Sequence, residues 1–160
     1  MEEILNLLRE NARLSAEDIA SMTKKTVDQV KEIIAKLEAD GVILKYAAII
    51  DPEKLGKGKS TYQAEIEVQC TLERGQTFDT IADRIYRFPQ VKSLYLMSGG
   101  YDLKIVIEGD DPRDIFYFVS GKLATIPGVR ATKTSLIMKT YKENDTIYVS
   151  DERDSREAMA

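Results

Sequence analysis

The sequence predicts an α+β protein in which three helices and a β-hairpin precede a β-α-β-β-α-β unit. Three patterns support this: helical spacing of apolar residues near the N-terminus, strict alternation over residues 61–72, and two strand-like runs around Gly99-Gly100. We expect a first domain over residues 1–54, a linker over 55–60, a second domain over 61–142, and an acidic, partly disordered tail over 143–160.

Each of the three N-terminal helices has a recognisable apolar stripe or cap. Residues 2–12 place apolar side chains on one face, and Ser15 is suited to the N-cap of the second helix, with Asp18 in the capping-box position. Thr26 and Gln29 form a better capping box for the third helix, which Gly41 is expected to end.

Two short apolar runs, 42–44 and 47–50, follow the third helix and are expected to pair as a hairpin. Three helices with a tight second turn and a following hairpin are typical of a winged helix-turn-helix, in which the third helix enters the DNA major groove. The pattern alone leaves open a three-helix scaffold that binds protein or nothing.

The outward face of the third helix is acidic at its centre and basic at its borders. Asp28 and Glu32 would repel phosphates, whereas an acid can also accept a hydrogen bond from cytosine. Lysines at the borders of this face could contact the DNA backbone without reading sequence. The candidate DNA-contacting residues are Lys24, Lys25, Thr26, Asp28, Gln29, Lys31, Lys36 and Lys45.

The second domain begins with the alternating strand over residues 61–72. A helix over 77–88 is stopped by Pro89, and the hairpin arms cover 91–97 and 103–108. A second helix opens at Asp111-Pro112 and carries Ile115, Val119, Leu123 and Ile126 on one face; a strand over 129–141 follows. This order is that of a ferredoxin-like fold, which leaves one sheet face bare, so we expect a homodimer.

The segment from Ser98 to Asp102 is the strongest candidate for a ligand site. Gly99-Gly100 can place both turn residues at positive φ in a tight hairpin, whose N–H groups can hold a carboxylate. Asp102 could hold an ammonium group, so this turn complements both ends of a free amino acid. The alternative is a plain hairpin turn, with Tyr101 as a packing residue and Asp102 bonded to its own backbone.

Composition argues against an enzyme. The chain has no histidine, one cysteine and no nucleophile, phosphate-loop or dinucleotide motif, so we expect no catalytic residues, metal or cofactor. No apolar run approaches a membrane span, and we expect a cytoplasmic protein without a membrane partner. The net charge of −4 resides in the tail after Lys142, so the neutral body exerts no overall attraction on nucleic acid.

Four motifs together resemble the Lrp/AsnC family of transcription regulators, over about residues 1–142. They are Leu37-Glu-Ala-Asp-Gly-Val-Ile43, Arg87-Phe-Pro-Gln-Val91, Ser98-Gly-Gly-Tyr-Asp102, and Pro127-Gly-Val129 with Thr132 and Thr134. The chain departs from the family at Ile33, where members typically have an arginine. That departure implies altered or weaker DNA specificity.

The resemblance implies an N-terminal winged helix-turn-helix on double-stranded DNA and a C-terminal ferredoxin-like ligand-binding domain. Dimers of such proteins assemble into octamers or other rings, and free amino acids bind between dimers. Carried over by position, the effector site would comprise Ser98, Gly99, Gly100, Tyr101, Asp102, Thr132 and Thr134. An amino-acid-responsive regulator is therefore expected; a nucleoid-organising protein without effector, and a metabolite sensor acting through protein partners, are the alternatives.

Overall fold

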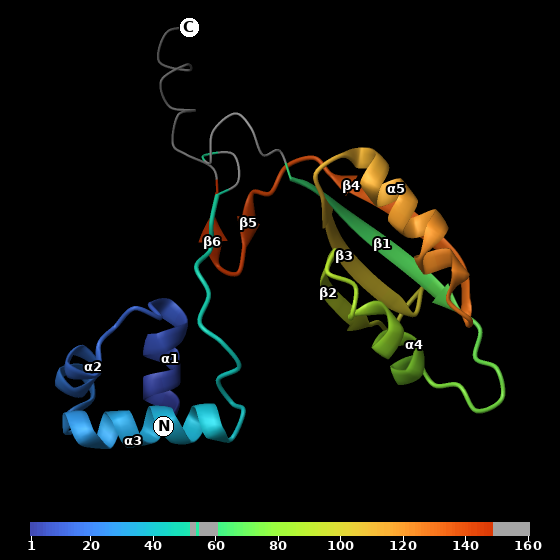
Figure 1. Ribbon diagram of the computed structural model, residues 1–160. Coiled ribbons are helices and arrows are strands. Elements are labelled where there is room, and N and C mark those ends of the chain that lie inside the picture. Colours follow the sequence, from blue (N-terminus) through green and yellow to red (C-terminus); the bar gives the residue numbers. More distant parts are fainter. Residues whose placement is uncertain (52–53, 55–60, 149–160) are drawn as a thin grey trace, which may run out of the picture. The chain divides into compact units, whose positions relative to one another are not determined.

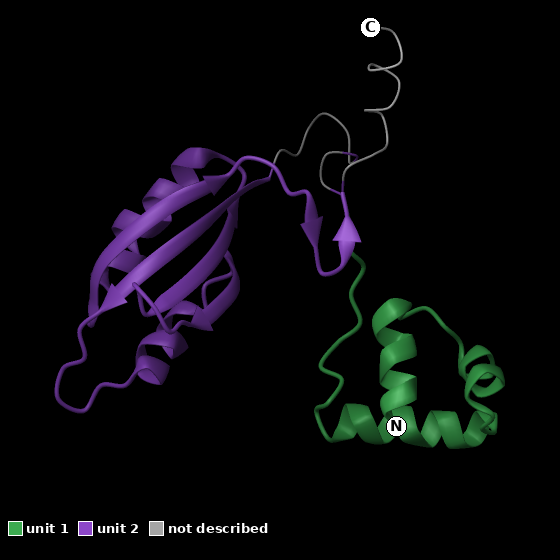
Figure 2. Cartoon of the chain, turned by 180° about the vertical axis from the view of Figure 1, so that it is seen from behind, with its two compact units in different colours: residues 1–50 green, residues 51–160 purple. Residues whose placement is uncertain are grey.

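The computed structural model describes residues 1–51, 54 and 61–148, which form two compact units, Met1–Ile50 and Asp51–Ala160 (Figures 1 and 2). The expected linker over 55–60 and the tail from residue 149 onward lie outside the described residues. Each unit has its own hydrophobic core, as expected for separate domains.

The first unit contains three helices, α1 (Glu2–Glu10), α2 (Ala16–Thr23) and α3 (Val27–Ala39). Their apolar stripes meet in one core, since every helix contributes buried residues to it. The core comprises Ile4, Leu8, Ile19, Ala20 and Val30.

Capping interactions set where α2 and α3 begin. The Ser15 hydroxyl accepts a hydrogen bond from the Asp18 N–H at 3.1 Å, and the Asp18 carboxylate accepts one from the Ser15 N–H. Thr26 and Gln29 make the same reciprocal pair at the start of α3. Lys24 connects the two helices in the left-handed conformation, with φ of 54°. These features confirm the predicted tight turn of a helix-turn-helix.

The predicted wing strands over 42–44 and 47–50 are wrong for this chain, because residues 42–50 form no strand. Only Lys45 and Tyr46 separate the two runs, and neither favours the positive φ angles of a tight hairpin. The Tyr46 hydroxyl instead donates a hydrogen bond to Glu38 of α3 at 2.9 Å. Burial, followed by this acidic neighbour, raises the pKa of Tyr46.

The second unit is built on a four-stranded antiparallel sheet in the order β2-β3-β1-β4 (Figure 1). The strands are β1 (Tyr62–Cys70), β2 (Val91–Leu96), β3 (Leu103–Gly109) and β4 (Val129–Ile137). Helices α4 (Phe78–Ile85) and α5 (Pro112–Gly121) cover one face of this sheet. The ferredoxin-like prediction is therefore confirmed, including the bare second face.

Alternation along the central strands assigns the two faces. Ala64, Ile66 and Val68 of β1 are fully buried beneath the helices, whereas Glu65 and Glu67 point to the open face. The helices add their own apolar stripes to the same core, through residues that include Ile81, Ile85, Ile115 and Phe118.

Two elements are shorter than predicted. The helix from Asp111-Pro112 ends at Gly121, and a 3₁₀ turn over Leu123–Thr125 carries the rest of the apolar stripe. Glycine weakens a helix, and Pro127 disfavours helical backbone at the preceding residue. The last strand ends at Ile137 instead of residue 141.

A small hairpin lies in a segment that was predicted to belong partly to the tail. Strands β5 (Lys142–Glu143) and β6 (Thr146–Ile147) pair around Asn144 and Asp145, whose φ angles are 45° and 61°. Two successive positive φ angles are typical of a type I′ turn, and Asn and Asp tolerate them. A Lys142–Asp145 ion pair of 3.0 Å spans the turn.

Candidate effector and DNA-binding sites

The loop at Gly99-Gly100 fills the gap between the predicted arms 91–97 and 103–108 and lacks the tight turn that its two glycines permit. Strand β2 ends at Leu96, strand β3 begins at Leu103, and the Met97 N–H donates to the Asp102 carbonyl at 2.8 Å. Residues 98–101 thus form a four-residue loop, which we call the effector loop. Neither glycine has a positive φ, so the predicted hairpin geometry is wrong. A longer loop bends gradually and needs no left-handed residue.

Gly99 and Gly100 are not required by their own chain. A Cβ atom added at either position would meet no heavy atom within 4 Å. Backbone conformation and packing within one chain would both accept alanine at these positions. A need for glycine here would have to come from a ligand or a second chain that approaches the backbone closely.

Asp102 follows the effector loop and lies beside the end of β1. Its Oδ2 atom accepts a hydrogen bond from the Cys70 N–H at 2.7 Å, and its own N–H donates to the Val68 carbonyl at 2.9 Å. Oδ1 has no partner among the described residues. Burial, and then the Asp102 charge, raise the pKa of the Cys70 thiol, so this thiol stays protonated and unreactive near neutral pH.

The other predicted effector residues occupy different surroundings. Ser98 is exposed and Tyr101 is half-buried. Thr132 and Thr134 lie on β4, opposite Val68 and Ile66 respectively, and so share the helix-covered face of the sheet. Strand β1 separates the two threonines from the effector loop. Within one chain, the structure brings Ser98 to Asp102 together and does not bring the threonines to them.

Sequence reasoning missed two side chains beside the effector loop. The Gln69 carboxamide donates to the Gly100 carbonyl at 3.4 Å and accepts from the Arg130 guanidinium at 2.6 Å. The β1–β4 register shifts next to Gln69, a β-bulge that no residue pattern in the sequence signals. The one feature of the sequence that could have pointed to this contact is Arg130, a basic residue directly after Pro127-Gly-Val129.

The predicted DNA-contacting residues gather around the α2–α3 turn and along α3. Thr26 and Gln29 are exposed, and their side chains are occupied in the α3 capping box. Lys25 is half-buried, and Lys31 lies 3.9 Å from Glu17 of α2 in an exposed ion pair. The remaining candidates are exposed: Lys24, Asp28, Lys36 and Lys45.

The centre of the outward face of α3 has the acidic character that the sequence predicted. Asp28, Glu32 and Ala35 are exposed, while Ile33 is half-buried and packs against the helical core. Ile33 is therefore a packing residue and presents no group that could bond to a base.

Comparison with known proteins assigns both units. Residues 63–147 match the Lrp/AsnC ligand-binding domain, and residues 2–43 match a winged helix-turn-helix DNA-binding domain. The chain is 46% identical to the uncharacterized HTH-type transcriptional regulator YugG of Bacillus subtilis, over 96% of this chain and 92% of that protein.

The chain belongs to the Lrp/AsnC family.

Solved structures agree with this fold. The transcriptional regulator NMB0573 of Neisseria meningitidis, solved in complex with L-methionine, shares 24% identity and a TM-score of 0.70 over 88% of this chain and 89% of that chain. A feast or famine regulatory protein of M. tuberculosis, complexed with L-methionine, shares 21% identity and a TM-score of 0.73 over 92% and 96%. Both support the two-domain Lrp/AsnC fold.

As an Lrp/AsnC protein, the chain is a transcriptional regulator with a helix-turn-helix and a ligand-binding domain, and not an enzyme. Residues 1–51, 54 and 61–148 contain no group of acidic or sulfur side chains placed to hold a metal ion. In the same part of the chain, every helix is too short or too polar to cross a bilayer.

The open face of the Lrp/AsnC sheet is polar and internally paired. Lys104 lies 2.6 Å from Glu65, and Lys133 lies 3.4 Å from Glu67. The hydrogen bond with Glu65 raises the pKa of Lys104, which is therefore charged at any physiological pH. Opposite charges thus cancel locally on this face, so it carries no strong field that would repel a second copy.

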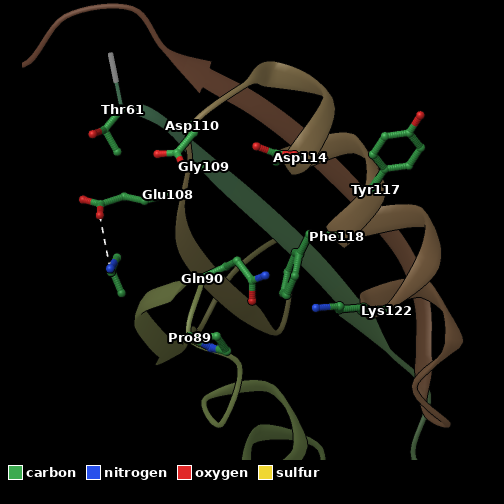
Figure 3. Close-up of a pocket in the computed structure, with 11 residues that line it drawn as sticks. Thr61, Pro89, Gln90, Glu108, Gly109, Asp110, Asp114, Tyr117, Phe118 and Lys122 are labelled. Carbon is green, nitrogen blue, oxygen red and sulfur yellow. Dashed lines mark ion pairs between the residues drawn. The ribbon is translucent and has the colours of Figure 1, made fainter. Parts of the chain in front are cut away.

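A pocket of about 620 Å³ opens at the opposite end of the sheet from the effector loop (Figure 3). Its wall comprises the residue before β1, the end of β3, the start of β2, and α5. Among the residues that the structure describes, the buried Gln90 Oε1 has no hydrogen-bond partner, and Lys92 is paired with Glu108 at 3.2 Å. None of the predicted effector residues lines this pocket.

Proposed function

We propose that this regulator binds a free amino acid at the effector loop and that the bound amino acid changes its DNA binding. The observation that supports this most is the geometry of Asp102. One of its carboxylate oxygens secures the end of β1, and the other is available to an ammonium group beside a glycine-containing loop with open surroundings. The L-methionine complexes of the two solved proteins support the same ligand class.

The proposed coupling runs through assembly. The open sheet face joins two copies, and dimers assemble further into an octamer or a similar ring. An amino acid between dimers favours one assembly over another, and the assembly sets the spacing of the helix-turn-helix units on DNA. Because each unit offers few free cations around an acidic centre, several units must bind together to reach useful affinity.

The competing function is a metabolite sensor that acts through protein partners. Asp28 and Glu32 at the centre of the α3 face favour it, since they disfavour phosphate contact. A DNA-organising protein without effector would keep DNA binding and show no response to amino acids.

The test is a titration of the full chain with DNA from upstream of its own coding sequence, followed by fluorescence anisotropy. The titration is run with and without each of the twenty common L-amino acids. We expect at least one amino acid to change the apparent Kd by about fivefold or more, the low end of typical allosteric couplings. DNA binding that ignores all twenty contradicts the sensor role, and absence of DNA binding favours the protein-partner function.

A charge-reversal variant of the two lysines at the α2–α3 turn tests whether DNA contacts this turn. Lys24→Glu with Lys25→Glu should weaken DNA binding and reduce its salt dependence, because fewer cations are released from phosphates on binding. Lys122→Glu with Lys139→Glu reverses the same number of charges in the other unit and serves as the control. An unaltered salt slope in the first variant would show that DNA does not meet the α2–α3 turn.

A further inference from the structure

A β-bulge changes the direction of one arginine beside the effector loop. Gln69 of β1 pairs with Ala131 and Cys70 pairs with Val129, so Arg130 is an extra residue on β4. Regular alternation from Thr132 would place Arg130 on the helix-covered face. Its guanidinium instead bonds to Gln69, which belongs to the open face. Bulges often redirect a side chain in this way.

The Gln69 carboxamide holds the guanidinium of Arg130 in relation to the effector loop. It accepts from Arg130 Nη2 at 2.6 Å and donates to the Gly100 carbonyl at 3.4 Å. The other guanidinium N–H groups of Arg130 have no partner among the described residues, and the side chain is exposed. A guanidinium fixed at one nitrogen retains donors for a second acceptor, and a carboxylate matches its geometry best.

Asp102 and Arg130 flank the same end of β1 from opposite sides. Asp102 directly precedes β3, Arg130 lies on β4, and both strands pair with β1. Two strand spacings separate their backbones by roughly 10 Å. The two side chains form no ion pair with each other, so both charges are available. The spacing fits a small molecule with an ammonium and a carboxylate group, each within hydrogen-bond distance of its partner.

We propose that Arg130 binds the carboxylate of the effector while Asp102 Oδ1 binds its ammonium group. This inference rests on the proposed function and adds to it a requirement: the effector must have a free α-carboxylate. The loop N–H groups, which the sequence suggested as the carboxylate site, are then secondary contacts. The chain thus binds the two charged ends of the ligand with two side chains on either side of β1, one just before β3 and one on β4.

The test compares each L-amino acid with its α-carboxamide, which keeps the ammonium group and loses the carboxylate. Calorimetry first identifies the amino acid among the twenty that binds the full-length protein most tightly. We expect its carboxamide to bind roughly 10- to 100-fold more weakly, the value of a hydrogen bond to a charged group. In Arg130→Gln, the two compounds should bind with similar affinity.

Two further variants separate ligand binding from a structural role. Lys133→Gln removes one positive charge from the same strand, where Lys133 is paired with Glu67, and should keep the full preference for the carboxylate. Arg130→Lys keeps the charge without the planar fork and should keep part of that preference. Circular dichroism and thermal unfolding of each variant should match the unaltered chain.

Three outcomes are decisive. If Arg130→Gln still prefers the amino acid over its carboxamide by the original factor, the role of Arg130 is overturned while the proposed function stands. The same conclusion follows if Lys133→Gln loses the preference equally. If none of the twenty amino acids binds the unaltered chain, the proposed function fails together with this inference.

Discussion

The two oxygens of Asp102 have different tasks. Oδ2 accepts the Cys70 N–H at 2.7 Å on the β3 side of β1, just beyond the last β1–β3 pair, Val68 with Leu103. A buried or half-buried N–H without an acceptor is costly, so this carboxylate stabilises the sheet end whether or not ligand is present. Oδ1 is the atom proposed to bind the effector. A single substitution at Asp102 therefore tests two properties, and they need to be separated.

We expect Asp102→Ala to lower the free energy of unfolding by about 1–3 kcal/mol, because the Cys70 N–H loses its acceptor. Asp102→Asn keeps a carbonyl oxygen for that N–H and should lose less stability. Both variants should lose amino-acid binding, since both remove the negative charge. Urea unfolding and calorimetric titration measure the two effects, with Asp110→Asn, an exposed acid at the other end of the sheet, as the control. Unchanged titration in Asp102→Asn would remove Asp102 from the effector site.

Helix α3 has the capping and packing of a stable helix, but the centre of its outward face is acidic. Its capping box, apolar stripe and packing against α1 and α2 are those of a helix that inserts into a DNA groove. Its exposed centre nevertheless carries Asp28 and Glu32, and Ile33 turns toward the core. The helix is thus positioned for DNA contact while two of its charges oppose phosphate.

Removal of those two charges should strengthen DNA binding. We expect Asp28→Asn with Glu32→Gln to tighten the Kd for upstream DNA by about thirtyfold at low salt, since each acid opposes a nearby phosphate by ~1 kcal/mol. The gain should shrink as salt increases. Glu2→Gln with Glu3→Gln makes the same change in net charge at the start of α1 and should have little effect. Equal gains in both variants would indicate a general charge effect and no contact through the α3 face.

The whole molecule is proposed to work as an assembly of identical chains. The sheet leaves one face open, and that face carries paired charges that a second copy can cover without meeting net repulsion. The proposed effector site lies at the end of this sheet, where a neighbouring dimer could complete it. Gly99 and Gly100, which nothing in their own chain requires, are consistent with close approach by another molecule.

Light scattering coupled to size-exclusion chromatography measures the proposed assembly and its response to amino acids. We expect particles that are multiples of the 18.1 kDa chain, with a distribution that changes when a pool of the twenty L-amino acids is added. Gly99→Ala with Gly100→Ala should keep the stability of the single chain and alter the assembly or its response. A particle size that never changes with amino acids would favour an architectural protein over a sensor.

Local sequence patterns correctly predicted the features that depend only on neighbouring residues. The capping pairs Ser15–Asp18 and Thr26–Gln29, the alternation of β1, and the apolar stripes of the helices are each contained within a few residues. The order of these elements was enough to identify both domains. The predicted wing failed because the runs 42–44 and 47–50, although apolar, have no turn residues to pair them.

The tight turn was predicted at the wrong place for a physical reason. Gly99-Gly100 permits positive φ but does not require it, and the pairing of Met97 with Asp102 widens the loop. Asn144-Asp145 adopts the two positive φ angles instead, in a segment that resembled an acidic tail. Glycine composition therefore shows which turns are possible, and strand register selects among them.

The sequence by itself determined the fold class, the family, the position of the loop that we propose as the effector site, and the acidic face of α3, because each depends on residue type and short-range spacing. Only the tertiary structure decided what surrounds the effector loop. The carboxylate of Asp102 reaches Cys70, and the bulge directs Arg130 to Gln69, across separations of 32 and 61 residues. Contacts of that kind arise from strand pairing and a register shift, and no local pattern encodes them.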